Sequence, residues 1–92
     1  MKNNQQLVLQ SLSMDLLRAA LGRHRGSHVM ADRFIEESKK RLSELDESFN
    51  QSLLSKINLV LSTKSDRQAE DLLMYSTILR NRSSLYNNYG SR

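Results

Sequence analysis

Apolar residues recur every three or four positions along most of this chain, which is the period of an amphipathic helix. The clearest stripe consists of Leu9, Leu12, Leu16, Ala19 and Ala20. The chain contains no proline and only three glycines, so little in it opposes long helices. The pattern predicts an all-α fold.

Four segments carry the helical period, and they span residues 5–21, 28–47, 51–62 and 66–82. Gly22 is placed to end the first helix in a left-handed conformation. Gly26 then permits a second bend, and Ser27 can cap the second helix. Together the segments predict a single domain over residues 1–82, a small antiparallel bundle of about four helices.

The boundary between the second and third helices is ambiguous in the sequence. The apolar stripe shifts phase between Phe49 and Leu53, and Ser48 and Asn50 are residue types that cap helices well. We therefore expect a turn, and one long bent helix is the alternative. Ser65 is the expected cap of the fourth helix. Residues 83–92 lose the period, which predicts a flexible C-terminal tail.

The charge is unevenly distributed over the 92 residues. The net charge is +4, and the stretch between Asp15 and Asp32 contains three arginines and no acid. The segment 72–92 likewise holds three arginines without an acid. This asymmetry suits a polyanion or an acidic partner, and ordinary solubility charge is the alternative interpretation.

The candidate anion-binding site is the turn between the first two expected helices, which we call the first corner. Arg18, Arg23 and Arg25 stand near Ser27, where the free backbone N–H groups of a new helix would attract phosphate. Arg80 and Arg82, at the end of the fourth helix, extend the candidate nucleic-acid surface. The alternative is that cations at the end of the first helix only stabilise that end.

The fourth helix has more apolar surface than one small core needs. We expect its side chains to form a protein interface, and packing beneath the first helix is the alternative. The candidate interface residues are Leu72, Met74, Tyr75 and Ile78. A chain of this length buries only about 60–65% of its unfolded surface, so support from a partner or a second copy is expected.

The sequence offers little for catalysis or metal binding. His24, His28 and Asp32 are spaced four apart, which on a continuous helix would suit zinc, but Gly26 interrupts it. We expect no metal, no cofactor, no small-molecule substrate and no enzymatic activity. The chain has no cysteine and no apolar run above four residues, which excludes a membrane span and fits a reducing, cytoplasmic environment.

Two families resemble this chain. Its length, basic charge and helix pattern resemble the helical small subunits of multi-subunit CRISPR interference complexes, which implies backbone contact with a bound strand. Residues 53–82, with Leu61, Thr63, Ser65 and Asp66 at a corner, are similar to the last two helices of small regulators of the YmgB/AriR type. That second resemblance implies a small regulatory protein.

These observations lead to two functional expectations. The first is a non-catalytic subunit of a larger assembly, which packs against protein neighbours and contacts the phosphates of RNA or DNA without reading sequence. The alternative is a small dimeric regulatory or adaptor protein that binds another protein.

Overall fold

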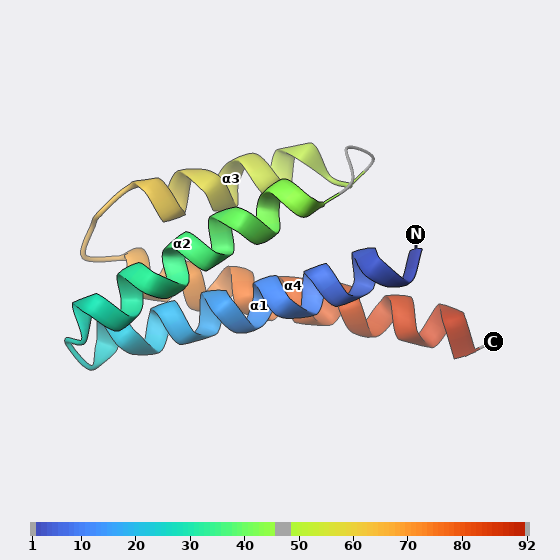
Figure 1. The fold of residues 1–92 in the computed structure, drawn as a ribbon, viewed down its shortest axis with the longest axis horizontal. Helices are drawn as coiled ribbons and strands as arrows, with labels where there is room; N and C mark the ends of the chain where they lie inside the picture. The colour runs from blue at the N-terminus through green and yellow to red at the C-terminus, as the bar shows by residue number, and fades with distance from the viewer. Residues whose placement is uncertain (1, 46–48, 92) are drawn as a thin grey trace.

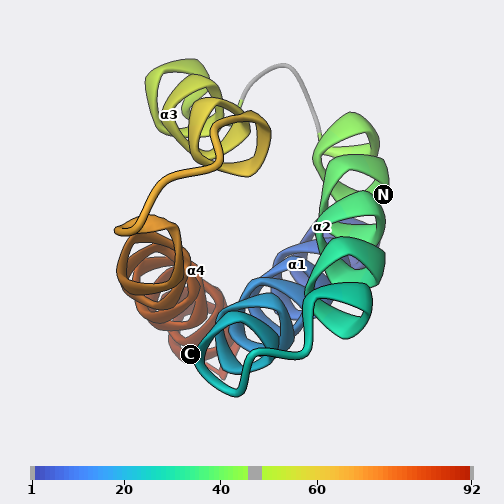
Figure 2. The same cartoon turned by 90° about the vertical axis from the view of Figure 1, so that its left-hand side faces the viewer.

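Four antiparallel helices make up the part of the chain that the structure describes. The computed structural model describes the backbone of residues 2–45 and 49–91, and the side-chain surroundings of residues 5–45 and 49–82. The helices are α1 (Lys2–His24), α2 (His28–Glu44), α3 (Gln51–Ser62) and α4 (Gln68–Ser91). They run alternately up and down the long axis, and end-on they lie at the corners of a four-sided arrangement (Figures 1 and 2). The predicted all-α bundle is confirmed.

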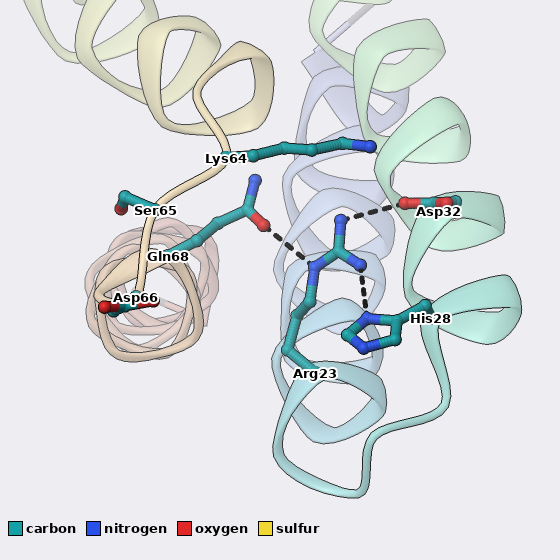
Figure 3. A pocket seen from close by; sticks show the side chains of 7 residues that line it. All are labelled: Arg23, His28, Asp32, Lys64, Ser65, Asp66 and Gln68. Atoms are coloured by element: carbon teal, nitrogen blue, oxygen red, sulfur yellow. Dashed lines mark hydrogen bonds and ion pairs between the residues drawn. The ribbon is translucent and has the colours of Figure 1, made fainter.

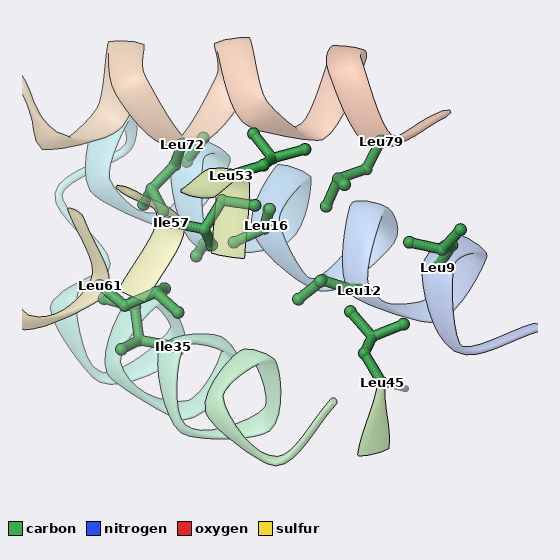
Figure 4. Close-up of a cluster of buried hydrophobic side chains, with 12 residues drawn as sticks. Leu9, Leu12, Leu16, Ile35, Leu45, Leu53, Ile57, Leu61, Leu72 and Leu79 are labelled. Carbon is green, nitrogen blue, oxygen red and sulfur yellow. The ribbon is translucent and has the colours of Figure 1, made fainter. Parts of the chain in front are cut away.

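The helix α1 is the centre of this arrangement. It packs along its length against both α2 and α4, whereas α3 touches those two helices more lightly. The predicted stripe on α1 is fully used, since Leu9, Leu12, Leu16, Ala19 and Ala20 are all buried. Ile57 of α3 and Leu72 of α4 complete the centre of the core (Figure 4).

Small polar side chains lie at the places where helices come closest. Ser13 and Ser76 are buried, and the Ser76 hydroxyl donates to the Ser13 carbonyl over 2.8 Å. Ser38 is also buried, and its hydroxyl donates to the Phe34 carbonyl over 2.8 Å. Each hydroxyl therefore has a partner, which removes the cost of burying it. The Ser76 bond also fixes how α4 is aligned along α1.

The end of α1 lies later than the sequence predicts. Gly22 does not end the helix, because α1 continues to His24 and the positive φ of 74° belongs to Gly26. The Ser27 N–H donates to the Gly22 carbonyl over 2.8 Å and the Gly26 N–H to the Arg23 carbonyl over 3.1 Å. This pair of bonds is the Schellman motif, with Gly26 in the left-handed position.

Gly22 has a different role, since it allows α2 to approach α1. A Cβ atom built on Gly22 would lie 2.9 Å from the Ala31 nitrogen and 3.1 Å from the Ala31 Cα. Both are backbone atoms, so they can move aside only if the start of α2 moves with them. The missing side chain of Gly22 thus brings the start of α2 close to the last turn of α1.

The other helix boundaries agree in part with the predicted ones. The turn before α3 is confirmed, with Asn50 as cap accepting from the Leu53 N–H over 3.1 Å. The second helix ends at Glu44 rather than residue 47, and residues 46–48 lie outside the described residues. The fourth helix begins at Gln68 rather than residue 66, because residues 66 and 67 form a turn.

The fourth helix also continues beyond its predicted end at residue 82. Its backbone is helical as far as Ser91, which is consistent with the absence of proline from the chain and of glycine from residues 68–89. The predicted end of the fourth helix at residue 82 is therefore wrong. The side chains of residues 83–92 lie outside the described residues, so the flexibility of this segment stays a prediction.

We expect Gly22→Ala to destabilise the protein, although alanine is worth about 1 kcal/mol more than glycine inside a helix. The added methyl would force α2 away from α1, and overpacking of this kind costs about 1–3 kcal/mol. Urea unfolding measures the effect. Ser11→Ala, at a partly exposed position of the same helix, is the control, and a stabilised Gly22→Ala variant would contradict the close approach.

Candidate functional site

The α1–α2 corner and the α3–α4 turn lie at the same end of the bundle (Figure 1). Between them is an open, bowl-shaped cavity of about 420 Å³. Its lining residues are Arg23, His28, Asp32, Lys64, Ser65, Asp66 and Gln68 (Figure 3). The fold thus joins the predicted corner to a second segment some forty residues further along the chain.

Arg23 forms the floor of this cavity, with a side chain that is only 14% exposed. Its Nε donates to Gln68 Oε1 over 2.9 Å, and its Nη2 to Asp32 Oδ1 over 2.8 Å. Its Nη1 lies 3.0 Å from His28 Nδ1, which must be the acceptor because a guanidinium only donates. Arg23 of α1 is therefore held by side chains of α2 and α4 and is not a free cation.

Gln68 connects the same floor to α3. It is 2% exposed, and its Nε2 donates to the Val60 carbonyl over 3.0 Å while its Oε1 accepts from Arg23. One amide side chain thus joins the ends of α1, α3 and α4. Sequence reasoning missed this role, because nothing in the helical pattern distinguishes Gln68 from a surface glutamine.

The expectation that the corner arginines lack a neutralising acid is wrong for two of the three. Arg18 Nη1 lies 3.6 Å from Asp15 Oδ1 on the same helix, and Arg23 pairs with Asp32 across the corner. The partners are Asp15 and Asp32, the two acids at the ends of the acid-free stretch. The helical turn brings Asp15 beside Arg18, and the α1–α2 turn brings Asp32 beside Arg23. Arg25 is exposed and makes no recorded ion pair within the described residues.

Asp15 is a buried carboxylate between α1 and α2, with 7% of the residue exposed. Burial raises the pKa of Asp15 above its ordinary value, and Arg41, 3.9 Å away, and Arg18 offset this only in part; Glu37 raises the pKa further. The Arg41 Nε is buried without a hydrogen-bond acceptor, so this ion pair is incompletely satisfied. A pair of this kind contributes little net stability.

The remaining predicted residues lie in different places. Ser27 caps α2 by position, but its side chain makes no capping hydrogen bond. Arg80 and Arg82 are exposed on α4, which begins at the bowl's end of the bundle and runs away from it (Figure 1). The Arg82 guanidinium lies 5.9 Å from the centre of the Phe49 ring. The structure therefore does not join these two arginines to the corner.

Most side chains of the predicted protein interface on α4 pack against the core of the monomer. Leu72 has no exposed surface, so its assignment to an interface is wrong. Tyr75 and Ile78 pack partly buried against the core, which leaves Met74, 47% exposed, as the outward residue of the four.

An exposed apolar stripe that was not predicted lies on α1. Leu7, Met14 and Leu21 are 58%, 41% and 37% exposed. Their spacing of seven residues is visible in the sequence and was the available signal.

The described residues contain no group of three histidine, cysteine or acidic side chains arranged to hold a metal ion. Within the same part of the chain, no helix is both long enough and apolar enough to cross a membrane. Comparison with protein-family models, curated proteins and solved structures finds no match. The two resemblances drawn from the sequence therefore remain predictions.

The raised pKa of Asp15 predicts that Asp15→Asn is as stable as the native chain or more stable at a pH above that raised pKa, where the native carboxylate is charged and buried. As the pH falls through the raised pKa, the native protein gains stability by protonating Asp15, and the advantage of the variant shrinks. Urea unfolding over a series of pH values measures both. A variant less stable above the raised pKa would mean that the ion pairs outweigh burial.

We expect Arg23→Lys to lower the free energy of unfolding by about 1–3 kcal/mol, because lysine cannot reach Gln68, His28 and Asp32 together and leaves buried polar atoms unpaired. Chemical unfolding measures the loss. Arg25→Lys, at an exposed position of the same corner, should stay within about 0.5 kcal/mol of the native chain. Equal effects in the two variants would contradict the structural role of Arg23.

Proposed function

We propose that this chain is a non-catalytic helical subunit that packs against a protein neighbour and touches nucleic-acid phosphates with one end. We name that surface the basic end and define it by Arg25, Lys64 and Arg67. The observation that carries the proposal is the arrangement of the fold, which places cations from two distant turns at the same end of the bundle.

The three cations of the basic end are available to a ligand. All three are exposed, and no ion pair is recorded for them within the described residues. Asp32, the nearest acid of α2, is already engaged by Arg23. The Lys64 side chain extends across the bowl toward α2 (Figure 3). Asp66, and Glu70 and Asp71 in the first turn of α4, are acids at the same end, so the proposal rests on the exposed heads of the three cations and not on a net positive charge there.

The helix termini add little to this charge. The helices α2 and α4 begin at the basic end, but α1 and α3 finish there, so their opposed dipoles largely cancel. The side chains therefore decide the attraction. The free N–H groups at the start of α2, which were expected to attract phosphate together with the corner arginines, therefore contribute less than the lysine and arginine side chains.

Little at the basic end supports the reading of bases. The described phenylalanines, Phe34 and Phe49, pack half-buried against the core. Contacts with phosphate and sugar position a protein on nucleic acid without specifying sequence. We accordingly propose binding to RNA or DNA that depends on salt and is insensitive to sequence.

A small dimeric regulator or adaptor that binds another protein is the second candidate function. This second candidate is supported by the ion pairs within the chain. Arg18, Arg23 and Arg41 each lie beside an acid of the same chain, which leaves less charge for a nucleic acid. The exposed stripe on α1 supplies apolar surface for a protein neighbour. A chain that shows no affinity for RNA or DNA at low salt would favour this second candidate.

We expect alanine at Arg25, Lys64 and Arg67 together to weaken binding to arbitrary RNA and duplex DNA and to flatten its salt dependence. Each lost phosphate contact should reduce the slope of log K against log salt by about 0.7 for single strands and about 0.9 for duplex DNA. Fluorescence anisotropy over a series of salt concentrations measures the slope.

A charge-matched control replaces Lys39, Lys40 and Lys56 with alanine. These lysines lie on α2 and α3 away from the basic end, so their loss lowers the net charge equally. An equal effect of the two triple variants would show that attraction is diffuse and would overturn the assigned surface.

A further inference from the structure

The outer face of α1 carries an apolar stripe that the monomer does not cover. We define this stripe by Leu7, Met14 and Leu21, which are 58%, 41% and 37% exposed. Residues seven apart lie close to one line along a helix, since two turns take about 7.2 residues. The core residues Leu9 and Leu16 occupy the opposite side of the same helix. The helix α1 is thus apolar on two faces, and folding buries one of them.

The surroundings of this stripe are nearly free of charge. Gln10, Ser11 and Leu17 border it, and Arg18 is the exposed ionic side chain beside its middle. An outward helix face in a soluble monomer is normally charged, as it is on α2, where Arg33, Glu36, Lys40 and Glu44 are exposed. Depletion of charge together with exposed leucine and methionine is typical of the centre of a protein interface.

The apolar surface continues onto α4. Ser76 faces α1, because its hydroxyl bonds the Ser13 carbonyl, and Leu73 lies one turn before Ser76 on the same side of α4. Leu73 is 42% exposed, so it widens the stripe across the line where the two helices meet.

We propose that two copies of this chain associate through the outer face of α1, with the two α1 helices antiparallel and Met14 on the two-fold axis. The spacing of the stripe supports a second copy as the occupant. Leu7 and Leu21 each lie seven residues from Met14, so a two-fold rotation places Leu7 of one copy against Leu21 of the other. An apolar side chain of the stripe thus meets an apolar side chain of the second copy at all three positions, so one patch can serve both copies, as a two-fold interface requires.

The charges on this face agree with the same arrangement. With Met14 on the axis, the position opposite Arg18 is Gln10 of the second copy, so no two cations face each other. The dimer deepens the protein-contact part of the proposed function by naming the neighbour. It does not depend on phosphate binding, because the basic end lies at one tip of α1 and the axis at its middle.

The absence of cysteine from the native chain allows a direct test, since a single introduced thiol reports on its own surroundings. In Met14→Cys, the two thiols lie across the axis and should form an intermolecular disulfide under mild oxidation at micromolar protein. Leu59→Cys is the matched control, because Leu59 is 67% exposed on α3, away from the stripe. Cross-linking of the two variants at equal rates would overturn the proposal.

Light scattering provides the second test. The native chain should have the mass of a dimer, and Met14→Glu should raise the dissociation constant by about tenfold or more by placing two carboxylates at the axis. Leu59→Glu should leave the dimer unchanged, and circular dichroism checks that both variants keep their helices. A native chain that is monomeric throughout, or a dimer insensitive to Met14→Glu, would overturn this interface.

The dimer and the phosphate-binding proposal can fail separately. A dimer without affinity for nucleic acid supports the interface and contradicts phosphate contact. A monomer that binds nucleic acid with the expected salt slope does the reverse. The alanine variant of the basic end should remain dimeric.

Discussion

The close approach of α2 and α4 to α1 is the constraint on which the bundle depends. On one side, Gly22 leaves room for the backbone of Ala31. On the other, Ser76 reaches the main chain of Ser13 with a hydroxyl and no longer side chain between the helices. Small residues at these points let the larger leucines of α1 meet the core from both directions. The helix α3 has fewer contacts with the rest of the bundle, and Gln68 of α4 joins the C-terminal end of α3 to α1 through its bonds with Val60 and Arg23.

The bundle also decides which of its charges remain outside. Asp15 draws Arg18 and Arg41 against α1, and Asp32 holds Arg23 beneath the corner. Part of the positive charge is thereby neutralised within the chain, and at Asp15 the cost of burying the carboxylate outweighs the attraction of the two arginines, so its pKa is raised. Among the described residues, the exposed cations without an ion pair are Arg25, Lys64 and Arg67 in the two turns at one end, and Arg33, Lys56, Arg80 and Arg82 along α2, α3 and α4. The distribution of charge along the sequence predicted contact with phosphate for Arg18, Arg23 and Arg25 at the first corner, and of these three only Arg25 belongs to the basic end.

The two surfaces proposed for this protein differ in their ligand and in their place on the bundle. The apolar stripe runs along the middle of α1, whereas the basic end is formed by turns at one tip of the bundle. An antiparallel pair of α1 helices would place the two basic ends at opposite extremes of the dimer. A two-fold assembly of this shape offers two separated phosphate contacts, which suits an extended nucleic acid better than a compact ligand.

The sequence by itself determined the all-α class, the core stripe of α1 and the turn capped by Asn50, because helical period and capping chemistry are local properties. It did not show that Leu72 points inward, that Gly22 serves a helix contact or that Arg23 meets Asp32 and Gln68. The period places Leu7, Met14 and Leu21 on one face, but it does not say whether a neighbour covers that face. Only the tertiary structure decided these matters, since contacts between distant segments depend on how helices are aligned in space.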